Sequence, residues 1–115
     1  GIFYSRCKKI FRLERNSCKN LEMLKTLEEL IATIRKRKDA SVKTSYTNKL
    51  LNDKKLIVEK VNEEILELIE SIQKNSNKVH EAADVLYHLM VLLEANNIKI
   101  EDVMDELKKR KKNNK

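Results

Sequence analysis

The chain has 115 residues, which is enough for one domain with a single hydrophobic core. It has no proline and one glycine, which disfavours the tight turns that many short strands require, and its 37% charged and 4% aromatic residues favour amphipathic helices. No apolar run reaches the roughly 18 residues of a membrane-spanning helix, and Cys7 and Cys18 lack the spacing of a zinc or redox site. We therefore expect an all-α, non-membrane protein with inert thiols, located in the reducing cytoplasm.

The formal net charge is +7, and the excess of basic residues lies at the two ends of the chain. Residues 1–20 carry +5 and residues 108–115 carry +6, which leaves −4 on residues 21–107. Basic ends on a mildly acidic body are typical of solvated tails and argue against a nucleic-acid partner. We predict a basic linker or remnant of an upstream segment over residues 1–20, a folded domain over 21–108 and a basic tail over 109–115.

The first half of the predicted domain contains one long and one short helix. Apolar residues at helical spacing run from Leu21 to Ile34, and the helix is expected to end in the basic stretch 35–38. Residues 39–47 are polar and rich in serine and threonine, which predicts a loop. This loop is expected to cap a short helix over residues 48–52.

Three further helices are predicted in the second half of the domain. The pattern gives long helices over residues 53–74 and 78–95, separated by a turn at residues 75–77. Asn96 and Asn97 mark a second turn before a shorter helix. The inner face of that helix is expected to carry Ile100, Val103, Met104 and Leu107. Together these elements predict a bundle of four main helices.

The helix over residues 53–74 has an apolar face and an adjoining acidic face. Its expected core side consists of Val61, Ile65, Leu68, Ile69 and Ile72. The neighbouring arc carries Glu63, Glu64 and Glu67, with Lys60 inside it. A solvated face gives a similar pattern, so EExxE alone is weak evidence for a metal site. Lys60 is either an ion-pair partner of Glu63 and Glu64 or a phosphate ligand.

The helix over residues 78–95 is apolar around nearly its whole circumference, and we expect it to be buried. Yet Glu81, Asp84 and His88 share one narrow polar stripe on it. Because burying an unpaired carboxylate costs several kcal/mol or more, a cation is the natural compensation. His88 is interpreted either as a hydrogen-bonded helix residue near Asp84 or as a metal ligand.

An antiparallel hairpin of these two helices predicts a cluster of carboxylates. Glu67 and Asp84 lie equally far from the turn and are expected to face each other, with the other three acids one turn away. Oxygen ligands alone favour magnesium, with manganese as the alternative, and magnesium usually binds a few carboxylates together with substrate phosphates. The cluster therefore predicts metal-assisted hydrolysis of a polyphosphate ester.

Three separated motifs extend the acidic pattern: SYTNKLL at residues 45–51, KVNEEILE at 60–67 and EAADVLYHLMVLL at 81–93. EExxE followed by ExxD resembles the all-α nucleoside triphosphate pyrophosphohydrolases. Within that group, the three motifs together resemble the phosphoribosyl-ATP pyrophosphatase family of histidine biosynthesis, from about Leu27 to Leu107. This chain has Asn62 where a glycine is common and lacks the usual proline and glycine before Ser45, departures that concern substrate fit rather than metal binding.

The resemblance implies magnesium-dependent hydrolysis of phosphoribosyl-ATP to phosphoribosyl-AMP and pyrophosphate. The implied metal ligands are Glu63, Glu64, Glu67, Glu81 and Asp84. The implied substrate-binding residues are Arg37, Lys38, Ser45, Tyr46, Thr47 and Lys49. We also assign Lys60 and His88 to substrate binding. The resemblance also implies a bundle completed by a homodimer whose active sites use both subunits, and fusion to or association with a phosphoribosyl-AMP cyclohydrolase.

Two other functions are compatible with parts of the sequence. A house-cleaning pyrophosphohydrolase of the same architecture would release pyrophosphate from noncanonical nucleotides or dNTPs. A noncatalytic helical adaptor or RNA-binding module would use the basic ends and bind RNA in a salt-sensitive manner.

Overall fold

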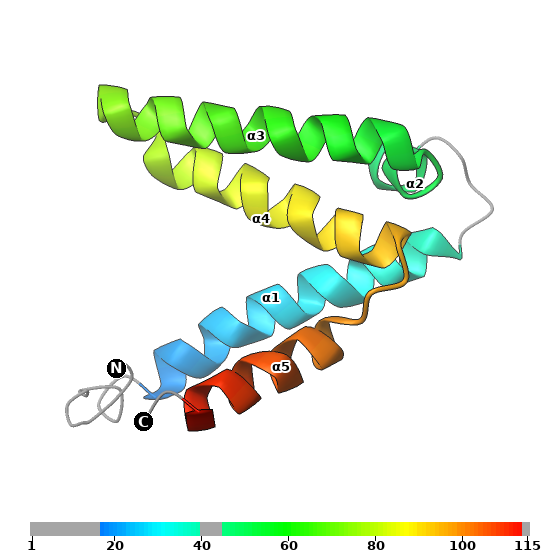
Figure 1. Cartoon of the computed structure of the whole chain (residues 1–115), viewed down its shortest axis with the longest axis vertical. Coiled ribbons are helices and arrows are strands. Elements are labelled where there is room, and N and C mark those ends of the chain that lie inside the picture. The colour runs from blue at the N-terminus through cyan, green and yellow to red at the C-terminus, as the bar shows by residue number, and fades with distance from the viewer. Residues whose placement is uncertain (1–16, 40–44, 114–115) are drawn as a thin grey trace. The chain divides into compact units, whose positions relative to one another are not determined.

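The computed structural model describes residues 17–39 and 45–113, with side chains from residue 24 to 39 and from 45 to 112. These residues form five α-helices and no strand (Figure 1). The helices are α1 (Ser17–Lys38), α2 (Tyr46–Leu51), α3 (Lys54–Lys74), α4 (Lys78–Ala95) and α5 (Ile100–Asn113). The all-α class predicted from the sequence is confirmed, and none of the described helices has the length and hydropathy needed to cross a membrane.

The chain divides into two compact units, with the boundary inside α1 between Thr33 and Ile34. The described part of the first unit is α1 up to Thr33. The second unit contains the last turn of α1 and helices α2 to α5. Most of the predicted linker over residues 1–20 and the centre of the predicted loop, residues 40–44, lie outside the described residues.

Polar side chains set the helix boundaries in the second unit. Ser45 caps α2 by accepting a hydrogen bond from the backbone N–H of Asn48, so α2 begins at Tyr46 and not at residue 48 as predicted. Asp53 caps α3 in the same way at the N–H of Leu56.

The turns at the ends of α4 contain asparagines in the left-handed region. Asn75 (φ 56°) and Asn77 (φ 58°) flank the turn between α3 and α4, and Asn97 (φ 59°) follows α4. Asparagine tolerates this conformation better than other residues with a Cβ, apart from aspartate. The turn and the bounds of α4 are as predicted, whereas α5 continues through most of the stretch assigned to a basic tail.

The core of the second unit lies where α2 packs against both α3 and α4 (Figure 1). Its largest fully buried side chains are Ile34, Leu50, Ile57 and Val91. Each contributes about 1.5–3 kcal/mol by burial. This core fixes the start of α3 and the end of α4, and α3 and α4 pack against each other from there to their connecting turn.

Much of the apolar surface expected to be buried is exposed. On α3, Val61 is buried, but Ile65, Ile69 and Ile72 are 39–57% exposed. The expected burial of α4 around its circumference is also wrong, since Val79 and Leu86 are exposed, and so are Met104 and Leu107 on α5. The reason is geometric, because a pair of helices has one mutual interface and the six residues of α2 cover only one end of the hairpin.

Candidate metal centre

Carboxylates from α3 and α4 converge between the two helices. Glu64, Glu67 and Glu81 each offer one oxygen, and these atoms lie within 4.8 Å of one another. A second group, meeting the same distance limit, is formed by His80, Glu81 and Asp84. Glu81 belongs to both groups, so the structure gathers four of the five predicted acids. Glu67 groups with Glu81 rather than with Asp84, the residue it was expected to face.

Two carboxylate oxygens in this cluster are buried without partners. Within the part of the chain whose side chains are described, Glu64 Oε1 and Glu81 Oε1 are the buried side-chain nitrogen or oxygen atoms that make no hydrogen bond. Glu64 as a whole is 7% exposed. A buried acceptor without a partner costs about 1–3 kcal/mol, and more when it is charged. An all-oxygen set of this kind fits a hard divalent cation.

The environment of Glu64 opposes its ionisation when no cation is bound. Burial is the main factor that raises the pKa of Glu64, and the nearby Glu67 and Asp84 carboxylates raise it further. His88 and Lys60 act in the opposite direction but do not cancel the increase. A bound cation would reverse this balance, because it stabilises the carboxylate form.

Glu63 lies outside both groups of converging ligand atoms. Its Oε1 accepts a hydrogen bond of 2.9 Å from Lys60 Nζ, which also lies 3.9 Å from Glu64 Oε2. The hydrogen bond to Glu63 is the main factor that raises the pKa of Lys60. Of the two interpretations of Lys60, ion-pair partner and phosphate ligand, the structure contains the ion pair. Glu63 is exposed on the same helix face.

Aromatic residues join the start of α2 to α4 beside the carboxylates. The Tyr46 hydroxyl lies 3.0 Å from His88 Nε2, and Thr47 Oγ1 is hydrogen-bonded to the Tyr87 hydroxyl. His88 Nδ1 lies 2.7 Å from the backbone carbonyl oxygen of Asp84. His88 is thus a buried, hydrogen-bonded helix residue, and its contact is with the backbone of Asp84 and not with the carboxylate.

Comparison with known proteins agrees with this arrangement. The sequence model of the family described as phosphoribosyl-ATP pyrophosphohydrolase matches residues 27–111. The chain belongs to this family. The matched range contains all the carboxylates of the cluster, both interhelical hydrogen-bonded pairs and the whole of α2 to α4.

Relatives of the phosphoribosyl-ATP pyrophosphohydrolase family differ in length. The phosphoribosyl-ATP pyrophosphatase of Clostridium novyi is 40% identical over 98 residues, which cover 80% of this chain and 86% of the relative. The histidine biosynthesis bifunctional protein HisIE of Pyrococcus furiosus is 42% identical over 94 residues, and the chloroplastic bifunctional protein of Arabidopsis thaliana is 43% identical over 95. These matches cover 81% and 76% of this chain but only 43% and 34% of the two bifunctional relatives.

In this family member, Arg37 and Ser45 meet on the side of α2. Arg37 Nη1 donates to Ser45 Oγ at 3.3 Å, and Asn48 Nδ2 donates to the Arg37 carbonyl oxygen at 2.8 Å. Lys49 is exposed on α2. The structure thus brings together two of the residues assigned to substrate binding, and it leaves the guanidinium of Arg37 exposed.

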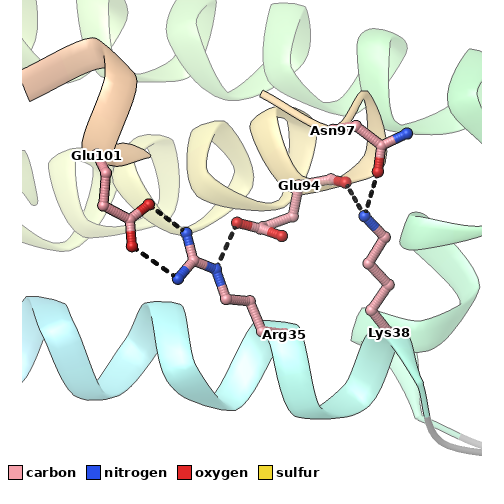
Figure 2. Close-up of polar contacts among 5 residues, drawn as sticks. All are labelled: Arg35, Lys38, Glu94, Asn97 and Glu101. Atoms are coloured by element: carbon pink, nitrogen blue, oxygen red, sulfur yellow. Dashed lines mark hydrogen bonds and ion pairs between the residues drawn. The ribbon is translucent and has the colours of Figure 1, made fainter. Parts of the chain in front are cut away.

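Lys38, also assigned to substrate binding, is engaged at the end of α4 (Figure 2). Its ammonium group donates to the Glu94 carbonyl oxygen and to Asn97 Oδ1, both at 2.7 Å. A cation at a helix C-terminus satisfies carbonyls that have no intrahelical partner. Two of the three donors of Lys38 are therefore used within the protein, which favours a structural role for this residue.

Arg35 holds the same region and was not singled out from the sequence. Its Nε contacts Glu94 Oε2 at 2.8 Å, and Nη1 and Nη2 donate to the two oxygens of Glu101 at 3.0 and 2.7 Å (Figure 2). The hydrogen bond from Arg35 is the main factor that lowers the pKa of Glu101 to about 2. The sequence offers one signal of this contact, because Glu94 is an acidic residue at the end of the most apolar helix, α4.

Proposed function

We propose that this chain hydrolyses phosphoribosyl-ATP to phosphoribosyl-AMP and pyrophosphate with a bound magnesium ion. The observation that carries the proposal is the convergence of Glu64, Glu67 and Glu81 with two buried, unpartnered oxygens. Relatives named phosphoribosyl-ATP pyrophosphatase, of which the chain covers about 85%, support the substrate assignment. They also favour it over the hydrolysis of noncanonical nucleotides.

Glu64, Glu67, Glu81 and Asp84 would hold the metal, and Glu63 would join them if its bond to Lys60 were exchanged for the cation. Magnesium bound there supplies electrostatic stabilisation of the phosphoryl oxygens and of the leaving pyrophosphate. Manganese fits the same oxygen ligands.

Basic and hydroxyl groups around the cluster would bind the substrate. Arg37 presents an exposed guanidinium beside Ser45, and guanidinium groups bind phosphate oxygens in a bidentate manner. Tyr46 is 48% exposed, and its hydroxyl is near enough to Lys60 and Glu64 for the first to lower and the second to raise its pKa. Lys49 and Thr47 belong to the same segment, but Thr47 is buried and is more suited to fixing α2 than to touching the substrate.

The proposed homodimer would cover the exposed apolar surface of the hairpin. The residues on this surface are Val58, Ile65, Leu66, Ile69, Ile72, Val79 and Leu86, each between 39% and 85% exposed. An apolar surface of this kind is unusual for a monomer and typical of a subunit interface. Light scattering should give twice the monomer mass for the unmodified chain and the monomer mass for Ile69→Glu. A monomeric unmodified chain would contradict the proposal.

Fusion to or association with a phosphoribosyl-AMP cyclohydrolase is a further proposal, supported by the bifunctional relatives. Such an enzyme would consume the product of the proposed reaction. The cytoplasmic location stays a prediction, and the Arabidopsis thaliana relative is a chloroplastic protein.

Turnover of phosphoribosyl-ATP with and without magnesium tests the proposed function. Glu64→Ala and Asp84→Ala should abolish pyrophosphate release while the helical circular dichroism persists. Glu70→Ala, an exposed change on the same helix, serves as the control and should retain activity. Release of pyrophosphate from dNTPs but not from phosphoribosyl-ATP would refute the substrate. Absence of turnover together with RNA binding that survives Glu64→Ala would favour the adaptor alternative.

A further inference from the structure

His88 makes polar contacts through both ring nitrogens although it is 6% exposed. Nδ1 lies 2.7 Å from the Asp84 carbonyl oxygen, which can only accept, so Nδ1 carries the proton and donates it. In the neutral ring Nε2 is then the acceptor, and the Tyr46 hydroxyl donates to it across 3.0 Å. The two contacts therefore select one tautomer and give the Tyr46 hydroxyl a single orientation.

The contact between Tyr46 and His88 is one of two successive links between α2 and α4. The next residue of α2, Thr47, bonds the hydroxyl of Tyr87, which precedes His88 on α4. The rings also pack, with centroids of Tyr46 and Tyr87 6.4 Å apart at an interplanar angle of 18°, and those of Tyr87 and His88 4.9 Å apart at 85°. Two adjacent residues on each helix thus define one register between α2 and α4.

The Tyr46 hydroxyl lies near enough to the carboxylates to interact with them electrostatically. Burial is the main factor that raises the pKa of Tyr46, while Lys60 lowers it, and Glu64 is close enough to contribute. About half of the Tyr46 surface remains exposed. Tyr46 is therefore accessible to a ligand at the carboxylate cluster, whereas the buried His88 is not.

We propose that His88 is a positioning residue that acts through Tyr46 and does not touch the substrate. Its Nδ1 is anchored to the backbone of Asp84, and its Nε2 holds the Tyr46 hydroxyl. The α4 backbone at Asp84 and a residue of the substrate-binding segment are thereby fixed relative to each other. The effect on catalysis rests on the proposed function, whereas the hydrogen-bond arrangement can be measured without it.

Two substitutions of His88 separate its two contacts. In His88→Gln the amide oxygen reaches the position of Nε2 and accepts from Tyr46, whereas in His88→Asn the amide reaches only the position of Nδ1. Tyr46→Phe removes the donor and leaves the half-exposed ring, so it tests the contact even if a His88 variant folds poorly. A hydrogen bond contributes about 1 kcal/mol, which is about a fivefold effect at 1.4 kcal/mol per decade.

Kinetics should follow the Tyr46 contact. We expect KM for phosphoribosyl-ATP to rise about five- to tenfold in His88→Asn and in Tyr46→Phe, with a smaller change in kcat. The double variant with His88→Asn and Tyr46→Phe should show no further increase in KM. The KM of His88→Gln should stay within about threefold of that of the unmodified chain. Mn²⁺ affinity should be unchanged in all four. Additive effects, or a His88→Gln variant as impaired as His88→Asn, would overturn the positioning role.

Nitrogen NMR of histidine-labelled protein at pH 7.5 tests the arrangement independently of turnover. The chain has two histidines, and the largely exposed His80 serves as the internal reference. His88 should show a protonated Nδ1 and an unprotonated Nε2 whose resonance shifts in Tyr46→Phe. A protonated Nε2, or no response to Tyr46→Phe, would overturn the proposal. If His88 shows the expected NMR signature but the chain does not hydrolyse phosphoribosyl-ATP, the contact between His88 and Tyr46 is supported and the proposed function is refuted.

Discussion

Replacing Glu64 with glutamine should stabilise the protein without metal and remove its response to metal. The Glu64 ligand oxygen lies within 4.8 Å of those of Glu67 and Glu81. Two unit charges at that distance repel by about 3.5 kcal/mol at an effective dielectric constant of ~20, so the two neighbours together repel Glu64 by about 7 kcal/mol. Lys60, 3.9 Å from Glu64 Oε2, returns about 4 kcal/mol of attraction on the same scale.

The net repulsion that Glu64→Gln removes is therefore about 2–3 kcal/mol, which screening of the partly exposed partners reduces to about 1–2 kcal/mol. Because each kcal/mol shifts the melting temperature of a domain of this size by about 4–8 °C, the midpoint in EDTA should rise by about 5–10 °C at pH 8. Glu70→Gln, the same substitution at an exposed position of α3, should change stability by less than about 0.5 kcal/mol.

The pH dependence has a defined sign. The pKa of Glu64 is raised above its usual 4.5 in the folded protein, so the unmodified chain loses stability as the pH rises through the folded value. The advantage of Glu64→Gln should thus be present at pH 8 and vanish at pH 4. Magnesium at 100 times its Kd should add about 2.7 kcal/mol to the unmodified chain and much less to the variant. Destabilisation of Glu64→Gln in EDTA at pH 8, or equal protection of both proteins by magnesium, would refute the reasoning.

Three further predictions concern the scaffold. Arg35→Met should lower the free energy of unfolding in urea by about 1–3 kcal/mol, because it leaves the largely buried Glu94 carboxylate without its cation; a loss below about 0.5 kcal/mol would contradict this. The pKa of Glu101 is lowered to about 2, so its ion pair stabilises the fold above pH 4.5 and is lost as the pH falls toward 2. In an acid titration Glu101→Gln should therefore lose less stability over this range than the unmodified chain, and equal losses would argue against the pair. Asp53→Ala should cost about 1 kcal/mol in thermal melts through loss of the cap at Leu56, while Asp53→Ser should retain most of the stability.

The helices of the second unit follow closely from the sequence because their signals are local. Apolar spacing, an asparagine turn and capping residues act within a few positions of one another, and the bounds of α4 were predicted without error. The start of α2 was predicted two residues too late, because Ser45 lies in a stretch rich in serine and threonine that predicts a loop. In the structure its side chain caps the helix at the N–H of Asn48. The helical pattern also predicted that Glu63 belongs to the cluster, whereas in the structure its side chain accepts from Lys60. The pattern locates a side chain on a helix face but does not decide whether that side chain turns toward Lys60 or toward α4.

Features that depend on distant residues were not accessible from the pattern. Arg35 is 59 residues from Glu94 and 66 from Glu101, and nothing local indicates that they meet. The helical pattern predicted the apolar face of α3 correctly, but it does not indicate whether the same chain or another copy covers that face. Ile69 and Ile72 are exposed in the single chain, and the sequence signal for a surface that another copy would cover is the same as that for a core.

The hairpin of α3 and α4 also bears on how the protein folds. Glu64 and Glu81 are separated by 17 positions and one three-residue turn, so their meeting requires the closure of a short loop only. Contacts of low sequence separation form early and fast, and a chain without proline has no prolyl isomerisation to wait for. The carboxylate cluster should therefore assemble at the stage of a helical hairpin, before the long-range Arg35 contacts. Refolding traces should lack a phase of tens of seconds.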